Sequence, residues 1–209
     1  MATPDFILAL REKIGHDMLW IPGCTAIVAR PYCSHPVHQS PAAGMRGKVC
    51  QNTSAPFEAT HPHCARMKAD EDFFMTPLAP EHVEILIVER ADNGWATPVT
   101  GIVDPGEEAA DAAVREVLEE TGVSARPLRL LSTQVVGPVT YDNADQALYL
   151  DLAFLLRWDA GEPWPADAEN TSAQFIRADR LPAMNNRFTK TVRRALSGEI
   201  AAEFTYSLT

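Results

Sequence analysis

Residues 101–123 read GIVDPGEEAADAAVREVLEETGV, and this stretch decides the fold. Asp104-Pro105-Gly106 predicts a turn, and apolar residues then recur at helical spacing, which predicts a helix over 108–121. Gly122 follows at the position where a left-handed residue commonly ends a helix. The predicted apolar stripe consists of Ala110, Ala113, Val114, Val117, Leu118 and Thr121.

The same helix carries a cluster of acidic residues. Glu116, Glu119 and Glu120 stand at i, i+3 and i+4, so their carboxylates are predicted to crowd one face, roughly opposite the apolar stripe. Arg115 relieves part of their repulsion, and Glu107 adds a fourth carboxylate. Oxygen ligands of this kind suit Mg²⁺ or Mn²⁺. The alternative interpretation is a solvated acidic face of an amphipathic helix.

The whole spacing is more specific than the glutamates alone. It comprises Gly101, five residues, Glu107, seven residues, Arg115-Glu116, an aliphatic residue, one residue, Glu119-Glu120, one residue, Gly122 and a second aliphatic residue. This pattern resembles the signature of the Nudix hydrolase family at every defined position. The resemblance implies an α/β/α sandwich with a mixed sheet. It also implies metal-dependent hydrolysis of the diphosphate linkage in a nucleoside diphosphate attached to another moiety.

The resemblance also implies roles for individual residues. Arg115 would orient the glutamates, and a carboxylate must accept the proton of the attacking water. We take Glu119 as the first choice for this base, Glu116 as the second, and Glu169, outside the signature, as a third. The implied metal ligands are the carbonyl of Gly101, Glu107 as an accessory or water-mediated ligand, and Glu116, Glu119 and Glu120.

The remaining chain supplies the other elements of a mixed sheet between helices. Periodicity predicts an amphipathic helix over 4–14 and a basic helix over 187–196. A loop over 137–143 is expected to join the two long strands. The predicted strands are 25–29, 83–88, 128–136, 147–158 and 173–176.

Length and charge limit the class of protein. The 209 residues predict a single domain, 1–209, in which 1–30 form the N-terminal helix and first strand, and 81–209 the core. Without an apolar run of about 18 residues we expect a cytoplasmic protein with no membrane partner. The net charge of −10 argues against a nucleic-acid partner and leaves a small nucleotide substrate. A homodimer through the N-terminal helix is left open.

Residues 31–80 are expected to form a long insertion. They hold seven of the 16 prolines, three of the four cysteines and four of the six histidines, with no clear helical or strand period. Coordination of a structural Zn²⁺ would stabilise such a segment. The alternative is a proline-rich surface loop with unconnected cysteines. The candidate zinc ligands are Cys33, His35, His38, Cys50, His61, His63 and Cys64.

Substrate choice depends on residues outside the signature. Pro138 resembles the downstream proline of ADP-ribose pyrophosphatases, whereas Tyr141 resembles a tyrosine of diadenosine polyphosphate hydrolases. The alternative, purely structural interpretations are a loop proline for Pro138 and a half-buried aromatic residue for Tyr141. Tyr141 and Trp95 are candidates to stack on a base. We expect ADP-ribose or a related nucleotide as substrate. The alternatives are nucleoside triphosphates, diadenosine polyphosphates, or a non-catalytic nucleotide sensor.

Overall fold

The computed structural model describes residues 3–32 and 71–206. The candidate zinc ligands, from Cys33 to Cys64, lie outside these ranges. No helix in the described ranges is long and apolar enough to cross a membrane.

The fold is built on one mixed sheet in which β1 (Leu19–Pro31) occupies the centre. β1 runs parallel to β6 over its length, and on its other side it pairs antiparallel first with β4 and then with β2. The sheet order is β3-β2-β1-β6-β5-β8, with β4 paired to β1 and β7 paired to β2. The other strands are β2 (Val83–Arg90), β3 (Ala96–Thr97), β4 (Val99–Ile102), β5 (Ser124–Thr140), β6 (Gln146–Ala160), β7 (Asn170–Arg177) and β8 (Glu203–Phe204).

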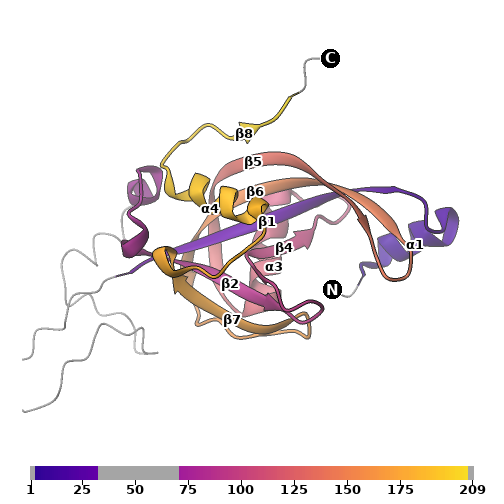
Figure 1. The fold of residues 1–209 in the computed structure, drawn as a ribbon, viewed down its shortest axis with the longest axis horizontal. Coiled ribbons are helices and arrows are strands. Elements are labelled where there is room, and N and C mark those ends of the chain that lie inside the picture. The colour runs from indigo at the N-terminus through magenta and orange to yellow at the C-terminus, as the bar shows by residue number, and fades with distance from the viewer. Residues whose placement is uncertain (1–2, 33–70, 207–209) are drawn as a thin grey trace, which may run out of the picture.

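Helices α3 (Ala109–Thr121) and α4 (Asn186–Leu196) cover opposite faces of this sheet (Figure 1). Side chains alternate along a strand, so Cys24, Ala26 and Val28 pack towards α3, while Ile27 and Ala29 pack towards α4. The predicted α/β/α sandwich with a mixed sheet is therefore confirmed. The third helix is α1 (Asp5–Ile14), and short 3-10 segments span Glu71–Met75, Pro80–His82 and Ala178–Arg180.

Two segments differ from the sequence-based expectation. The loop predicted over 137–143 is wrong, because β5 continues to Thr140 and pairs with β6 across a register shift between Val136 and Val139. Backbone pairing with β6 thus overrides the local turn preference of Gly137-Pro138. In addition, residues 71–80, expected within the insertion, supply the buried side chains of Phe74 and Leu78 to the core on the α4 face.

Candidate active site

The guanidinium of Arg115 holds three of the predicted acidic side chains. It makes a two-pronged contact with Glu107, in which Nε and Nη2 each donate to a carboxylate oxygen at 2.9 Å. Nη1 donates to Glu116 at 2.9 Å and to Glu119 at 3.1 Å. Nη2 also donates to the carbonyl of Ile102, at the end of β4, at 3.1 Å. Arg115 therefore fixes the turn of 103–108 and the helix against each other.

Glu107 closes the turn that leads into α3. Its Oε2 accepts a hydrogen bond from the backbone N–H of Asp104 at 3.1 Å. The hydrogen bonds from Arg115 hold the pKa of Glu107 below its usual value, and the carboxylates in turn raise the pKa of Arg115. Glu107 is thus a fixed anion at the start of the helix, where the helix dipole also favours negative charge.

Gly101 lies directly against Glu116. It pairs with Cys24 across β4 and β1, and a Cβ added at Gly101 would overlap the side chain of Glu116. Burial and the neighbouring carboxylates Glu119 and Glu169 raise the pKa of Glu116 to about 7, although Arg115 opposes this shift. Glycine at this position lets a carboxylate approach the backbone of β4.

Glu120 lies on the packed side of α3, so the prediction of three carboxylates opposite the apolar stripe is wrong for this residue. Its side chain is 4% exposed, whereas Leu118 of the predicted stripe is 51% exposed. Asn170 Nδ2 donates to Glu120 Oε2 at 2.7 Å. Burial raises the pKa of Glu120 to about 8, Asn170 opposes the shift, and the negative charge of Glu169 adds to it.

The loop between β6 and β7 brings further polar groups to the carboxylates. The backbone N–H groups of Trp164 and Ala166 donate to the carbonyls of Thr121 and Glu120, at 3.1 and 2.9 Å. This docks the loop on the C-terminal end of α3. Glu169, the third candidate base, follows in the same loop and raises the pKa of both Glu116 and Glu120 by its charge.

Sequence reasoning missed Asn170, which has no motif of its own. Only its position next to Glu169, on the loop before the predicted strand 173–176, pointed to this segment.

The donor set fits Mg²⁺ or Mn²⁺. All the candidate side chains offer oxygen, the donor that these cations prefer. Burial, and to a lesser extent the neighbouring carboxylates, raise the pKa values of Glu116 and Glu120, and a nearby cation would favour their charged forms. In the described ranges no group of three such side chains is already placed to hold a metal ion.

The two aromatic candidates for substrate binding lie on different turns. Trp95, between β2 and β3, is 59% exposed, and its backbone N–H donates to Asn93 Oδ1 at 2.9 Å. Tyr141 begins the turn between β5 and β6, and its hydroxyl bonds to that of Tyr149. Both rings present area to the surface, and their contact with a base remains a proposal.

Known proteins resemble this chain in both sequence and fold. A NUDIX domain model matches residues 73–196, more than half of the chain. The NAD-capped RNA hydrolase NudC of Salmonella agona is 30% identical over 154 residues, which cover 73% of this chain and 52% of that protein. NudC of Vibrio cholerae is 31% identical over 122 residues, or 57% of this chain and 42% of that protein. The chain spans about half the length of the curated relatives it matches.

Two solved structures show the same fold. The MutT NUDIX hydrolase from Burkholderia pseudomallei has a TM-score of 0.50 at 16% identity, covering 84% of this chain and 98% of that one. A UDP-X diphosphatase has a TM-score of 0.52 at 12% identity, covering 96% and 73%. With the domain match and the residues around Arg115, these findings show that the chain belongs to the Nudix hydrolase family.

Proposed function

We propose that this protein hydrolyses the diphosphate linkage of a nucleoside diphosphate joined to another moiety, with Mg²⁺ or Mn²⁺ as cofactor. The observation that carries the proposal is the convergence of Glu107, Glu116 and Glu119 on Arg115, with Gly101 lying against Glu116. Glycine at position 101 is what leaves room for the Glu116 carboxylate against β4. That approach brings the carboxylate and the backbone carbonyl close enough to serve the same cation.

Each residue of the cluster has a distinct task in this proposal. Glu116, Glu119 and Glu120 hold the cation, together with the carbonyl of Gly101, and Glu107 assists. The cation, when bound, supplies positive charge that neutralises the diphosphate and eases attack by water. Arg115 holds Glu116 and Glu119 in place between turnovers.

A carboxylate takes the proton of the attacking water. Glu119 is our first choice because it is the most exposed of the helix glutamates, with 57% of its side chain accessible, and can reach a substrate without unpacking. Glu116 and Glu169 are the second and third choices.

The proposed substrate is ADP-ribose or a related nucleotide. The diphosphate linkage of NAD has the same chemistry, and the relatives named above are NAD-capped RNA hydrolases. Hydrolysis by this chain would release AMP from either compound.

The test is a substrate panel. Purified protein is incubated with Mn²⁺ or Mg²⁺ and ADP-ribose, NADH, diadenosine polyphosphates or nucleoside triphosphates, and the phosphate-containing products are separated. Release of AMP from ADP-ribose or NADH, abolished by EDTA, is the expected result. Tight nucleotide binding without turnover across the panel would refute the hydrolase and favour a sensor.

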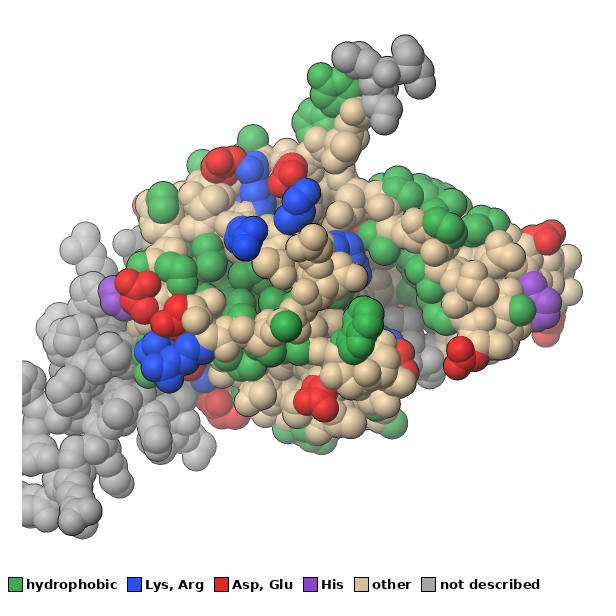
Figure 2. All heavy atoms as spheres, in the orientation of Figure 1, with side chains coloured by type: hydrophobic (Ala, Val, Ile, Leu, Met, Phe, Trp, Pro, Cys, Tyr) green, Lys and Arg blue, Asp and Glu red, His purple; other side chains and the backbone are tan. Residues whose placement is uncertain are grey.

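A second candidate substrate is RNA that carries a nucleotide cap. We expected no nucleic-acid partner from the net charge, but α4 bears four cations and no acidic residue. Lys and Arg side chains gather on the face of the molecule shown in Figure 2. Hydrolysis of capped RNA that weakens steeply between 50 and about 200 mM salt would support this candidate, because phosphate contacts release counterions. If hydrolysis of capped RNA depended on salt no more than hydrolysis of ADP-ribose does, capped RNA would be excluded as a substrate.

A further inference from the structure

A buried carboxylate on the α4 face of the sheet has no part in the proposed chemistry. Asp151 of β6 is 4% exposed. Its Oδ1 accepts from Thr25 Oγ1 at 2.7 Å, and its Oδ2 accepts from Gln134 Nε2 and from Arg187 Nη1, both at 3.0 Å. A buried ion pair of this kind is weak evidence for stability, because apolar residues of similar size often serve as well. Its value must therefore lie in what it orients.

Asp151 fixes the direction of two side chains that reach towards solvent. Because Nε2 of Gln134 points to the carboxylate, the carbonyl oxygen of this amide points away from it as an acceptor. Arg187 uses Nη1 on Asp151 and Thr25, and its side chain remains 24% exposed. The pair thus presents a fixed acceptor beside fixed donors, which matches the polar edge of a nitrogen heterocycle.

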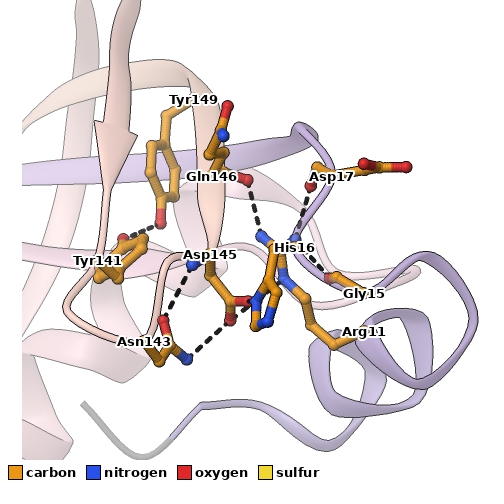
Figure 3. Close-up of polar contacts among 9 residues, drawn as sticks. All are labelled: Arg11, Gly15, His16, Asp17, Tyr141, Asn143, Asp145, Gln146 and Tyr149. Atoms are coloured by element: carbon orange, nitrogen blue, oxygen red, sulfur yellow. Dashed lines mark hydrogen bonds and ion pairs between the residues drawn. The ribbon is translucent and has the colours of Figure 1, made fainter.

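An aromatic ring stands next to this polar pair. Tyr149 lies two residues before Asp151 on β6, so both side chains are on the α4 face. The hydroxyl of Tyr149 bonds to that of Tyr141 across the hairpin (Figure 3). Part of the ring packs on the apolar cluster that includes Ile7 and Ile21, and its remaining accessible surface is available for stacking on a base.

Helix α1 holds the hairpin that carries both tyrosines. As Figure 3 shows, Arg11 donates to the carbonyl of Gln146 at 2.7 Å, and His16 is hydrogen-bonded to Asp145 at 2.7 Å. Asn143 Nδ2 donates to the same carboxylate at 3.0 Å. These contacts fix the turn of 141–145 against α1, and the molecular surface is hollowed between this lobe and the rest of the molecule (Figure 2).

Gly23 connects the tyrosine to the candidate metal site. A Cβ at Gly23 would lie 3.3 Å from the carbonyl oxygen of Gly101 and 3.5 Å from Cδ1 of Tyr149. The carbonyl oxygen of Gly101 and the ring of Tyr149 thus both lie close to Gly23, while Glu116 lies against Gly101. A nucleotide whose diphosphate lies at this carbonyl can therefore extend its base along Tyr149 towards Gln134 and Arg187.

We propose that Tyr149, Gln134 and Arg187 form the base-recognition surface of this protein, with Asp151 as the positioning residue. The ligand class is a nucleotide whose base stacks on Tyr149 and offers a donor to Gln134 and an acceptor to Arg187. This inference rests on the proposed function for the placement of the diphosphate, but it predicts binding whether or not hydrolysis occurs.

The test is calorimetric binding of AMP and UMP in the presence of Mg²⁺, since neither contains a diphosphate to hydrolyse. Gln134→Met keeps the side-chain length and leaves Asp151 its bonds to Thr25 and Arg187, so the fold is retained. Gln174→Met is the matched control, because Gln174 is exposed on β7. Thermal melting of each variant checks folding.

The wild type is expected to bind AMP and UMP, because adenine and uracil each place a donor beside an acceptor on one edge. Gln134→Met is expected to weaken binding about tenfold, the effect of losing one good hydrogen bond, whereas Gln174→Met should leave it unchanged. Tyr149→Leu weakens both nucleotides, because stacking is tolerant of the base. Unchanged affinity in Gln134→Met, or an equal loss in Gln134→Met and Gln174→Met, would overturn the inference. A wild type that binds both nucleotides yet hydrolyses nothing in the substrate panel would refute the proposed function alone.

Discussion

Asn170 donates a hydrogen bond to Glu120 at 2.7 Å where both side chains are more than nine-tenths buried. The two residues are fifty positions apart, and the bond joins the start of β7 to the last turn of α3. An amide can donate to a carboxylate in either protonation state, but it favours the charged form. Asn170 therefore opposes the rise in the pKa of Glu120 that burial causes.

Asn170→Ala should weaken cation binding, because the carboxylate of Glu120 loses the donor that stabilises its charged form. We expect the Mn²⁺ affinity at pH 7.5 to fall about tenfold, which corresponds to the loss of one hydrogen bond to a charged group. Titration followed by Mn²⁺ electron paramagnetic resonance measures it. Asn93→Ala, in the turn after β2, is the control, and equal affinities in both variants would argue against this role of Asn170.

Glu119→Gln should lower kcat by orders of magnitude while leaving the fold intact, since it removes a cation ligand and the first-choice base. The side chain is more than half exposed, so the cost in stability should stay near the 0.5 kcal/mol typical of surface changes. The matched control is Glu108→Gln, at the exposed N-cap of the same helix. Near-normal turnover in Glu119→Gln would refute the assigned chemistry.

Without metal, the protein should lose stability as pH rises from about 5 to 8. The pKa of Glu116 is raised to about 7 and that of Glu120 to about 8, above the value of about 4.3 in an unfolded chain. A raised carboxyl pKa gives stability that is fully present below the unfolded pKa and is lost as pH passes the folded pKa. Melting temperatures in EDTA at pH 5, 6.5 and 8 measure the slope.

Two additions identify the groups responsible for this slope. Glu120→Gln keeps an acceptor for Asn170 but cannot ionise, so it should flatten the decline between pH 6.5 and 8. Mn²⁺ should raise the melting temperature most at pH 8, where it binds the ionised carboxylates. An EDTA slope identical in wild type and Glu120→Gln would contradict the raised pKa of Glu120.

Cys24 should be inert in the folded protein. Burial, together with the charge of Glu116, raises the pKa of its thiol to about 12, and only the thiolate reacts rapidly with alkylating agents. We expect iodoacetamide at pH 8 to modify Cys24 more than about 100-fold faster in guanidinium chloride than in the native state. Mass spectrometry of the peptide that contains Cys24 follows both rates, and similar rates would show that the strand pair opens readily.

The local part of the site was predictable from sequence. The turn, the helix and the Arg115–Glu119 contact involve residues close in sequence, and i,i+4 spacing on a helix brings these two side chains together. The left-handed Gly122 is likewise confirmed, with a φ of 67°.

The burial of Glu120 was not predictable in the same way, because it depends on Asn170 and on the loop before β7. The sequence pattern predicted Glu120 to lie roughly opposite the apolar stripe, whereas tertiary contacts cover this residue. The same reason explains β5, whose extension to Thr140 is a property of its pairing with β6 and not of its own residues.

Trp164 covers Gly122, and this contact bears on how the signature can be exchanged between proteins. A Cβ at Gly122 would lie 2.5 Å from Nε1 of the Trp164 indole. The backbone N–H of Trp164 donates to the carbonyl of Thr121. The helix and the loop that follows β6 therefore pack as one structural unit, although Trp164 lies 41 positions after residue 123, the last residue of the signature. A chimera that grafts residues 101–123 onto a relative should recover its full melting temperature only if residues 161–170 are grafted with them.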